Sequence, residues 1–170
     1  LNKKLLRKKY NIPLEDVIVL YVGRLNPDKG IMDLIKVFNS LKKSYKNLSI
    51  IFVGFEDGVK ISEIKNNIED KYKKSFYHFK YTSKPNHFMR LSDILCIPSY
   101  REGFGQVIIE AAACGTPAVV SNIYGLKDSI IDRKTGLFFK TKNLIDLKKK
   151  IIKLINDKNL RKKMSNNCEK

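Results

Sequence analysis

Short apolar runs alternate along this chain with segments in which apolar residues recur every three or four positions. The apolar runs, several of them ended by glycine or proline, predict strands at residues 17–22, 48–53, 75–79, 94–97, 118–120 and 137–139. The helical spacing predicts helices near residues 31–41, 61–68, 84–91, 105–114, 143–155 and 159–167. The opening stretch LNKKLLRKKY has the pattern of an amphipathic helix.

The alternation of continuous apolar strands with helices indicates a fold class. Strands that are apolar on both faces belong to parallel sheets covered by helices on each side. We therefore expect a doubly wound, Rossmann-like α/β fold. Ligands of such folds bind beyond the carboxyl ends of the strands, which directs attention to the loops that follow each strand.

Composition bounds the class of protein. The chain has 170 residues, of which 43% are hydrophobic, enough for one compact domain with a real core. Its net charge is +17, from 34 basic and 17 acidic residues. Such a charge favours nucleic acid, anionic lipid or phosphate ligands, although a compositional bias toward lysine explains it equally well. No zinc-ligand spacing, RNA-binding aromatic signature or helix-turn-helix pattern accompanies it.

The cysteines and the hydropathy of the chain indicate the cellular compartment in which the protein is expected. The three cysteines, Cys96, Cys114 and Cys168, match no disulfide or metal framework, which favours a reducing cytosol. No apolar run reaches the roughly 18 residues of a membrane span, and no signal peptide is visible. Because the chain opens at Leu1 inside a helical pattern, we expect it to be a piece of a longer protein.

The loop GRLNPDKG, residues 23–30, follows the first predicted strand. It places Arg24 and Lys29 in a glycine-bounded turn just before a helix. A helix amino terminus attracts phosphate, an arginine can hold two of its oxygens, and a lysine adds a point charge. The alternative is an ordinary surface turn formed around Pro27 and Asp28. The next strand-end loop, VGFEDGVK, reads as a turn without convergent chemistry and with at most a minor role at the cleft.

The stretch IPSYREGFGQVIIE, residues 97–110, carries two carboxylates eight positions apart, Glu102 and Glu110. We expect Gly103 and Gly105 to allow close approach of a ligand to the backbone. The N–H groups of residues 104–107 would then be free donors at the start of a helix. On a helical wheel the packed stripe comprises Phe104, Val107, Ile108, Ala111 and Ala112, and Glu110 lies off it beside Gln106.

Glu110 could therefore accept hydrogen bonds from a vicinal diol such as that of a ribose. Glu102, nearer the helix start, could hold the hydroxyls of a second sugar. The alternative is a pair of solvated glutamates.

At these residues the chain resembles the retaining GT-B glycosyltransferases of family 4. Glu102 and Glu110 match that family's E-x7-E motif, and GRLNPDKG resembles its G-R-L-x-x-x-K-G loop. The stretch SDILCIPSYREGFGQVIIEAAACGTPAVVSN resembles its core signature, and RKTGLFF resembles a segment near the end of the domain. One departure is YGLKDSI, where the family often has Gly-Gly-x-x-Glu, so we expect no ligand role for that loop.

The resemblance implies a domain organisation. Residues 17–170 would form the carboxyl-terminal domain of a two-domain enzyme, the domain that binds a nucleotide-sugar donor. Residues 1–16 would be a linker helix from an amino-terminal acceptor domain.

The resemblance also assigns roles to the loop residues. Arg24 and Lys29 would bind the donor diphosphate, with Gly23 beside them, and Glu102 would contact the transferred sugar. The backbone of Gly103, Phe104, Gly105, Gln106 and Val107 would approach the sugar and phosphate, and Glu110 would hold the ribose. The base would lie near Lys80 and Tyr81. Catalysis would rest on Arg24, Lys29 and Glu102, without a metal ion or another cofactor.

The implied partners are the donor and a glycan or lipid-linked acceptor of cell-surface polysaccharide synthesis. The implied location is the cytoplasm, with contact to the anionic inner membrane face and no nucleic acid. Two alternatives remain at this point. One is a basic module that binds nucleic acid or membranes without transferase activity, and the other is a sugar-nucleotide epimerase of the same fold.

Overall fold

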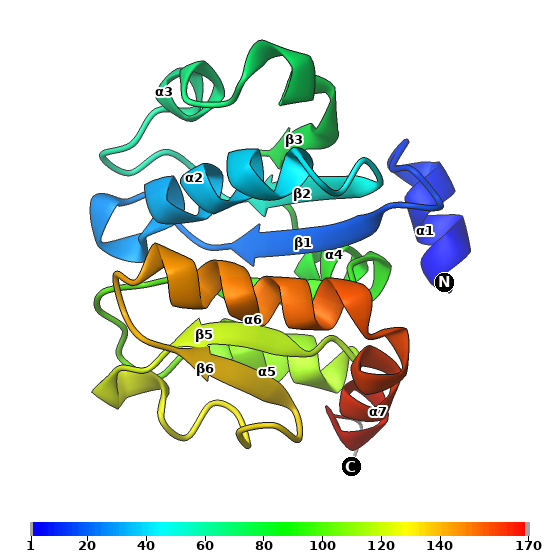
Figure 1. The fold of residues 1–170 in the computed structure, drawn as a ribbon, viewed down its shortest axis with the longest axis vertical. Helices are drawn as coiled ribbons and strands as arrows, with labels where there is room; N and C mark the ends of the chain where they lie inside the picture. The colour runs from blue at the N-terminus through cyan, green and yellow to red at the C-terminus, as the bar shows by residue number, and fades with distance from the viewer. Residues whose placement is uncertain (1, 169–170) are drawn as a thin grey trace.

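The computed structural model describes residues 2–168 and confirms the α/β architecture (Figure 1). A six-stranded sheet, parallel throughout, has the strand order β3-β2-β1-β4-β5-β6. Its strands are β1 (Val17–Val22), β2 (Leu48–Val53), β3 (Phe76–Phe79), β4 (Ile94–Ile97), β5 (Ala118–Ser121) and β6 (Gly136–Phe139). Residue 1 and residues 169–170, the outer ends of the predicted ranges 1–16 and 17–170, lie outside the described residues.

The helices cover both faces of this sheet. They are α1 (Lys3–Lys9), α2 (Ile31–Lys42), α3 (Ile61–Asn66), α4 (Pro85–Leu91), α5 (Gln106–Ala113), α6 (Leu144–Asn156) and α7 (Lys158–Cys168). In Figure 1, α2 and α6 lie in front of the sheet and α4 and α5 behind it. Short 3-10 turns occur at η1 (Pro27–Lys29), η2 (Asp70–Ser75) and η3 (Tyr124–Leu126).

The predicted boundaries hold closely where a strand is apolar on both faces. β1, β2 and β4 have the predicted limits, and all six residues of β2 are buried. The third strand begins one residue late because Ser75 belongs to η2, and α3 ends at Asn66, before the predicted Ile68. Ile68 is nevertheless buried, so the apolar pattern identified a core position although the helix does not reach it.

The strand order reverses between β1 and β4. The chain winds outward from β1 through β2 to β3, then crosses back to place β4 on the other side of β1. The carboxyl ends of β1 and β4 are therefore adjacent at a topological switch point, the place where open α/β sheets bind ligands. In Figure 1 the strand arrows point left, whereas the two chain ends lie at the right, on the opposite edge of the sheet.

The predicted linker helix packs onto the domain as part of its core. Leu6 and Ile12 are buried in the main apolar cluster, and Tyr10 stacks on Phe88 with ring centroids 4.6 Å apart. The Arg7 guanidinium, only 5% exposed, donates to the carbonyl of Leu91 and to a carboxylate, that of Asp93.

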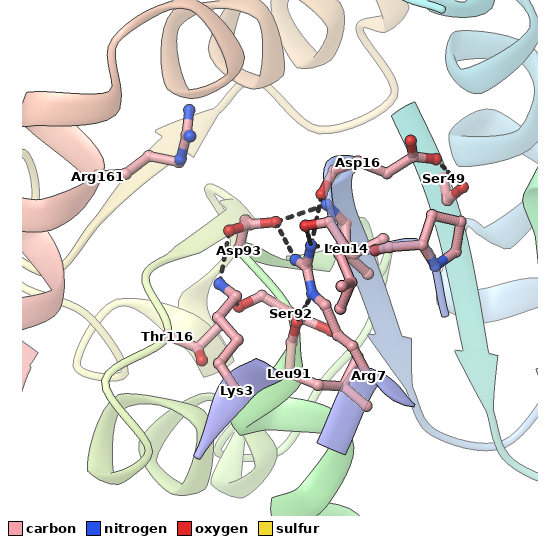
Figure 2. A network of polar contacts seen from close by, with 12 residues as sticks. Lys3, Arg7, Leu14, Asp16, Ser49, Leu91, Ser92, Asp93, Thr116 and Arg161 are labelled. Atoms are coloured by element: carbon pink, nitrogen blue, oxygen red, sulfur yellow. Dashed lines mark hydrogen bonds and ion pairs between the residues drawn. The ribbon is translucent and has the colours of Figure 1, made fainter. Parts of the chain in front are cut away.

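Asp93, just before β4, holds α1 against the amino-terminal edge of the sheet (Figure 2). Its carboxylate accepts hydrogen bonds from Lys3 at 2.6 Å, Arg7 at 2.8 Å and the Ile18 N–H at 2.7 Å. Burial alone would raise the pKa of Asp93, but Lys3, the Ile18 N–H and Arg7 together hold that pKa below its ordinary value. The carboxylate therefore stays charged in the folded protein at neutral pH.

We predict that Asp93→Asn lowers the free energy of unfolding by about 3 kcal/mol, because it leaves buried Arg7 without its counter-ion. Urea denaturation followed by circular dichroism measures this. Asp70→Asn is the matched control. Asp70 pairs with Lys73 on the exposed surface, so this substitution should leave the free energy of unfolding almost unchanged. Equal effects of the two substitutions would contradict the role of Asp93.

The same carboxylate predicts a pH dependence. Because the folded-state pKa of Asp93 lies below its ordinary value of 3.8, its stabilisation is complete above that value and is lost as the pH falls through the folded-state pKa. The loss of stability below about pH 4 should thus be shallower in Asp93→Asn than in the unchanged chain. Denaturation curves from pH 3 to pH 7 provide the measurement, and parallel profiles would contradict the prediction.

Candidate functional site

The loops that follow β1 and β4 touch each other at the switch point. The Tyr100 N–H donates to the Asp28 carbonyl at 2.7 Å. Gly30 has a φ of 63°, and a Cβ added to it would lie 2.1 Å from the Pro98 carbonyl oxygen. A left-handed backbone in so tight a contact requires glycine. This contact brings the GRLNPDKG loop against the residues that precede α5.

Lys29 and Glu102 meet across this contact. The Lys29 ammonium lies 2.7 Å from a Glu102 carboxylate oxygen, and the Ser99 hydroxyl donates to the same oxygen at 2.8 Å. The two charged side chains are mostly buried, with 17% and 19% of their areas exposed. The structure thus joins two residues 73 positions apart that the sequence had placed in separate ligand-binding loops.

An open cleft of about 510 Å³ lies over this pair. It is lined by Arg24, Asn26, Asp28, Lys29, Arg101, Glu102 and Gly103. Three of these side chains are cationic and two are carboxylates. Four predicted site residues therefore share one cleft: Arg24, Lys29, Glu102 and Gly103.

Arg24 is held by a residue for which we predicted no role. Its guanidinium pairs with Asp57 at 2.9 Å, and the Asn26 amide donates to the same carboxylate oxygen at 3.1 Å. Asp57 belongs to the VGFEDGVK loop, whose backbone pairs with the first loop through the N–H and carbonyl of Leu25. The expectation that this loop lacks convergent chemistry is wrong. The signal that could have pointed to Asp57 is a carboxylate three residues after Gly54, the glycine that follows β2.

A smaller pocket of about 230 Å³ adjoins the Arg24 side of the cleft. Gly23, Arg24 and Lys80 line it together with Phe55, Tyr81 and other residues. Phe55 and Tyr81 are 47% and 81% exposed, so two aromatic rings border the pocket and are free to contact a ligand. The structure thus places Lys80 and Tyr81 at one pocket with Gly23 and Arg24, and a base at this position stays a prediction.

Glu110 lies on the solvent face of α5. Glu110 is exposed, and the Gln106 amide donates to its carboxylate at 3.2 Å, which confirms that the two share a face. Ile108 and Ala111 form the buried stripe, and Val107 is half-buried. Neither Gln106 nor Glu110 lines the cleft, so any ligand they contact must extend from the cleft along the helix.

Two expectations for the start of this helix are wrong. Phe104 is 61% exposed and lies outside the packed stripe, because the helix begins at Gln106 with Gly105 as its amino cap. The N–H donors of the helix start thus begin at Gly105 and not at Phe104. Gly105 is buried, and an added Cβ would lie 2.6 Å from the Leu126 side chain, so packing alone already requires glycine at this position.

Two tyrosine hydroxyls hold the residues around the GRLNPDKG loop in place. Tyr21 donates to the Arg24 carbonyl at 2.7 Å, and burial raises the pKa of Tyr21. Tyr100 donates to Asp33 at 2.7 Å, and burial together with Asp33 raises the pKa of Tyr100 to about 12. Both hydroxyls remain protonated donors at physiological pH.

The chemistry of the cleft is that of an anion site. Arg24, Lys29 and Arg101 line it, and the amino end of α5 follows directly after Glu102 and Gly103. Within residues 2–168, no three His, Cys, Asp or Glu side chains gather closely enough to hold a metal ion. The absence of a metal from the reaction stays a prediction.

The sequence matches the family model described as "Glycosyl transferases group 1" over residues 2–170. The chain belongs to this family. Among the family's curated members, it is 31% identical to the capsular polysaccharide biosynthesis glycosyltransferase CapM of Staphylococcus aureus, over 99% of this chain and 44% of CapM.

Solved structures of other proteins superimpose on the fold. The S. aureus protein TarM, 28% identical, matches with a TM-score of 0.82 over 92% of this chain and 32% of TarM. The lipopolysaccharide glycosyltransferase WaaG matches with a TM-score of 0.89 over 99% of this chain and 46% of WaaG; at 23% identity this likeness concerns the fold alone. The chain therefore spans less than half the length of these relatives.

We predict that Gly30→Ala destabilises the chain by about 2 kcal/mol or more, because a Cβ on this left-handed backbone collides with the Pro98 carbonyl. Thermal unfolding measures the effect. Gly103→Ala is the control, since a Cβ there meets no atom within 4 Å and the melting temperature should hardly change. A Gly30→Ala variant as stable as the control would show that the loop contact is not structurally required.

Proposed function

We propose that this chain is the donor-binding half of a retaining hexosyltransferase. The enzyme transfers a sugar from a nucleoside-diphosphate sugar to a glycan or lipid-linked acceptor in cell-surface polysaccharide synthesis. The observation that carries the proposal is that Arg24 and Lys29 line the same cleft at the switch point. The amino end of α5 lies beside them, just after Glu102 and Gly103 in the sequence. Family membership supports the transferase class, and the structure of TarM, described as a complex containing UDP, supports a nucleotide donor.

The diphosphate would replace the carboxylates that now neutralise the two cations. Lys29 is paired with Glu102 and Arg24 with Asp57, so each cation has one carboxylate partner in the absence of ligand. An entering diphosphate offers Lys29 and Arg24 stronger charge-assisted hydrogen bonds. Its arrival would release Glu102 to accept hydrogen bonds from the hydroxyls of the transferred sugar.

The other parts of the nucleotide-sugar would occupy the neighbouring surfaces of the site. The base would occupy the pocket bordered by Lys80, Phe55 and Tyr81, beside Gly23. The ribose would lie along α5, where Glu110 accepts from its diol and Gln106 supports Glu110. The backbone of Gly103 through Val107 would approach the sugar and the phosphates.

Catalysis would then be electrostatic. As the bond to the sugar breaks, negative charge grows on the leaving nucleoside diphosphate. Arg24, Lys29 and the amino end of α5 are fixed donors at the place where that charge develops. We propose that these groups suffice without a metal ion or a further cofactor, and that the attack occurs on the same face as departure, which retains the anomeric configuration.

The acceptor site and the compartment are further parts of the proposal. A separate amino-terminal domain would supply the acceptor site and the other wall of the cleft. We place the enzyme in the cytoplasm, at the inner face of the membrane, where its positive charge would favour anionic lipid. No helix within residues 2–168 is long and apolar enough to cross a bilayer.

The two alternatives find no support in the relatives. CapM is described as a glycosyltransferase of capsular polysaccharide biosynthesis, and neither CapM nor TarM is described as an epimerase or a nucleic-acid-binding protein. We therefore propose no nucleic-acid partner.

We predict that UDP binds the 170-residue chain and that Glu110→Ala weakens this binding by about 1–3 kcal/mol, through loss of the ribose hydrogen bonds. Lys29→Ala should weaken it by a similar amount, because the diphosphate loses a charge-assisted contact. Isothermal titration calorimetry with UDP and other nucleoside diphosphates provides the measurement. Glu63→Ala, on α3, is the control and should leave the affinity unchanged.

Unchanged affinity in Glu110→Ala would show that this carboxylate is merely solvated. No detectable binding of any nucleoside diphosphate to the unchanged chain would contradict the donor-binding proposal itself. In a longer enzyme that contains both halves, Arg24→Ala should abolish most turnover, and near-normal turnover would remove Arg24 from the mechanism.

A further inference from the structure

A second basic cavity lies at the amino-terminal edge of the sheet, on the side opposite the donor cleft. It has a volume of about 600 Å³ and is bordered by α1, the segment before β1 and the beginning of α7. A smaller cavity of about 220 Å³ adjoins it and shares Lys3, Asp93, Lys158 and Arg161. The donor cleft shares no lining residue with either cavity.

Basic side chains from both ends of the chain converge on this cavity. Five cations line the larger cavity, against three carboxylates: Lys3, Lys4, Arg7, Lys158 and Arg161 against Glu15, Asp16 and Asp93. Lys162 lines the smaller cavity as well. Two of the carboxylates already have partners, since Asp93 accepts from Lys3 and Arg7, and Asp16 accepts from the Ser49 hydroxyl at 2.5 Å. The cavity therefore holds a surplus of positive charge.

Several of these cations lack a counter-ion. The side chains of Lys4, Lys158 and Lys162 make no ion pair or hydrogen bond with any group in residues 2–168. Arg161 donates through one nitrogen, Nη1, to the carbonyls of Leu154 and Ile155, which leaves its other nitrogens free to face the cavity. Figure 2 shows Arg161 on α7, apart from the Asp93 network and with no dashed line joining it to that network.

The convergence is electrostatically unfavourable without a further anion. Burial lowers the pKa of Lys3, and the nearby charges of Arg7 and Arg161 lower it further, although Asp93 opposes the change. α1 and α7 thus hold cations close together, and among the described residues Asp93 forms ion pairs only with the cations of α1, Lys3 and Arg7. A bound anion would remove this repulsion, and the free nitrogens of Arg161 together with Lys158 form the donor set that phosphate oxygens prefer.

We propose that this cavity binds a phosphate group, through Arg161, Lys158 and Lys3, at a site separate from the donor cleft. The phosphate belongs either to a small phosphorylated metabolite or to the headgroup of an anionic lipid. The proposal does not depend on the function of the donor cleft, because the two sites lie on opposite edges of the sheet and share no residue.

The test is a titration of the isotope-labelled 170-residue chain with inorganic phosphate, followed by amide NMR shifts. It uses the Arg24→Ala, Lys29→Ala background, so that the donor cleft does not compete for the ion. Shifts at Lys3, Lys158 and Arg161 that saturate are the expected result. The proposal is overturned if these amides do not shift, or if they shift no more than the amides of exposed lysines on α3.

The matched variants are Lys158→Glu and Lys163→Glu. Both lysines are exposed on α7, but only Lys158 lines the cavities. Lys158→Glu should weaken phosphate binding about tenfold, the effect of one charge-assisted contact, whereas Lys163→Glu should leave it nearly unchanged. Equal weakening by the two variants would show general charge attraction and overturn the site. Neither lysine has a side-chain partner to lose among the residues that the structure describes, so both variants should fold.

Two further arms distinguish the sources of the phosphate. Binding of soluble glycerol 3-phosphate that Lys158→Glu weakens supports a metabolite. Flotation with phosphatidylglycerol vesicles, absent with phosphatidylcholine vesicles and weakened by Lys158→Glu, supports a lipid headgroup. Failure of both arms in the unchanged chain overturns the proposal.

Discussion

The close approach of the Gly30 backbone to the Pro98 carbonyl allows the two loops on which the donor cleft depends to meet, and the Tyr100 N–H joins them by donating to the Asp28 carbonyl. β1 and β4 are neighbours only because the strand order reverses between them, so their loops come from distant parts of the sequence. A side chain at position 30 would push the loops apart. With glycine there, Lys29 reaches Glu102, and the cleft acquires its central ion pair.

The cleft has a balanced charge before any ligand arrives. Arg24 and Lys29 each have a carboxylate partner, and both partners come from loops other than their own. This arrangement keeps two cations in place at low electrostatic cost, since each carboxylate offsets the repulsion between them. It would also allow an exchange of partners on ligand binding. Phosphate oxygens would replace the carboxylates as partners of the two cations, and the carboxylates would then accept hydrogen bonds from hydroxyl groups.

The sequence alone was sufficient for the parts of the structure that depend on local pattern. β1, β2 and β4 were predictable because each is a continuous apolar run that a glycine or a proline ends. The rule that ligands bind beyond the carboxyl ends of the strands then identified the loops of Arg24 and Glu102. Contacts between distant residues were not predictable in this way. Asp57 meets Arg24 only because Leu25 pairs with the VGFEDGVK loop, and Asp93 meets Arg7 across 86 positions. Phe104 was misplaced because the wheel extended the helical pattern to a residue that precedes the first helical residue, Gln106.

The two ends of the parallel strands carry two different basic sites. The carboxyl edge carries cations paired with carboxylates, and the amino edge carries cations of which several have no partner. The proposed donor site is the one at the carboxyl ends of the strands. A crystal structure of this chain with UDP tests it most directly. We predict that the diphosphate lies between Arg24, Lys29 and the amino end of α5, with Lys29 separated from Glu102 and the ribose beside Glu110. UDP bound elsewhere, or bound with the Lys29–Glu102 pair intact, would contradict it.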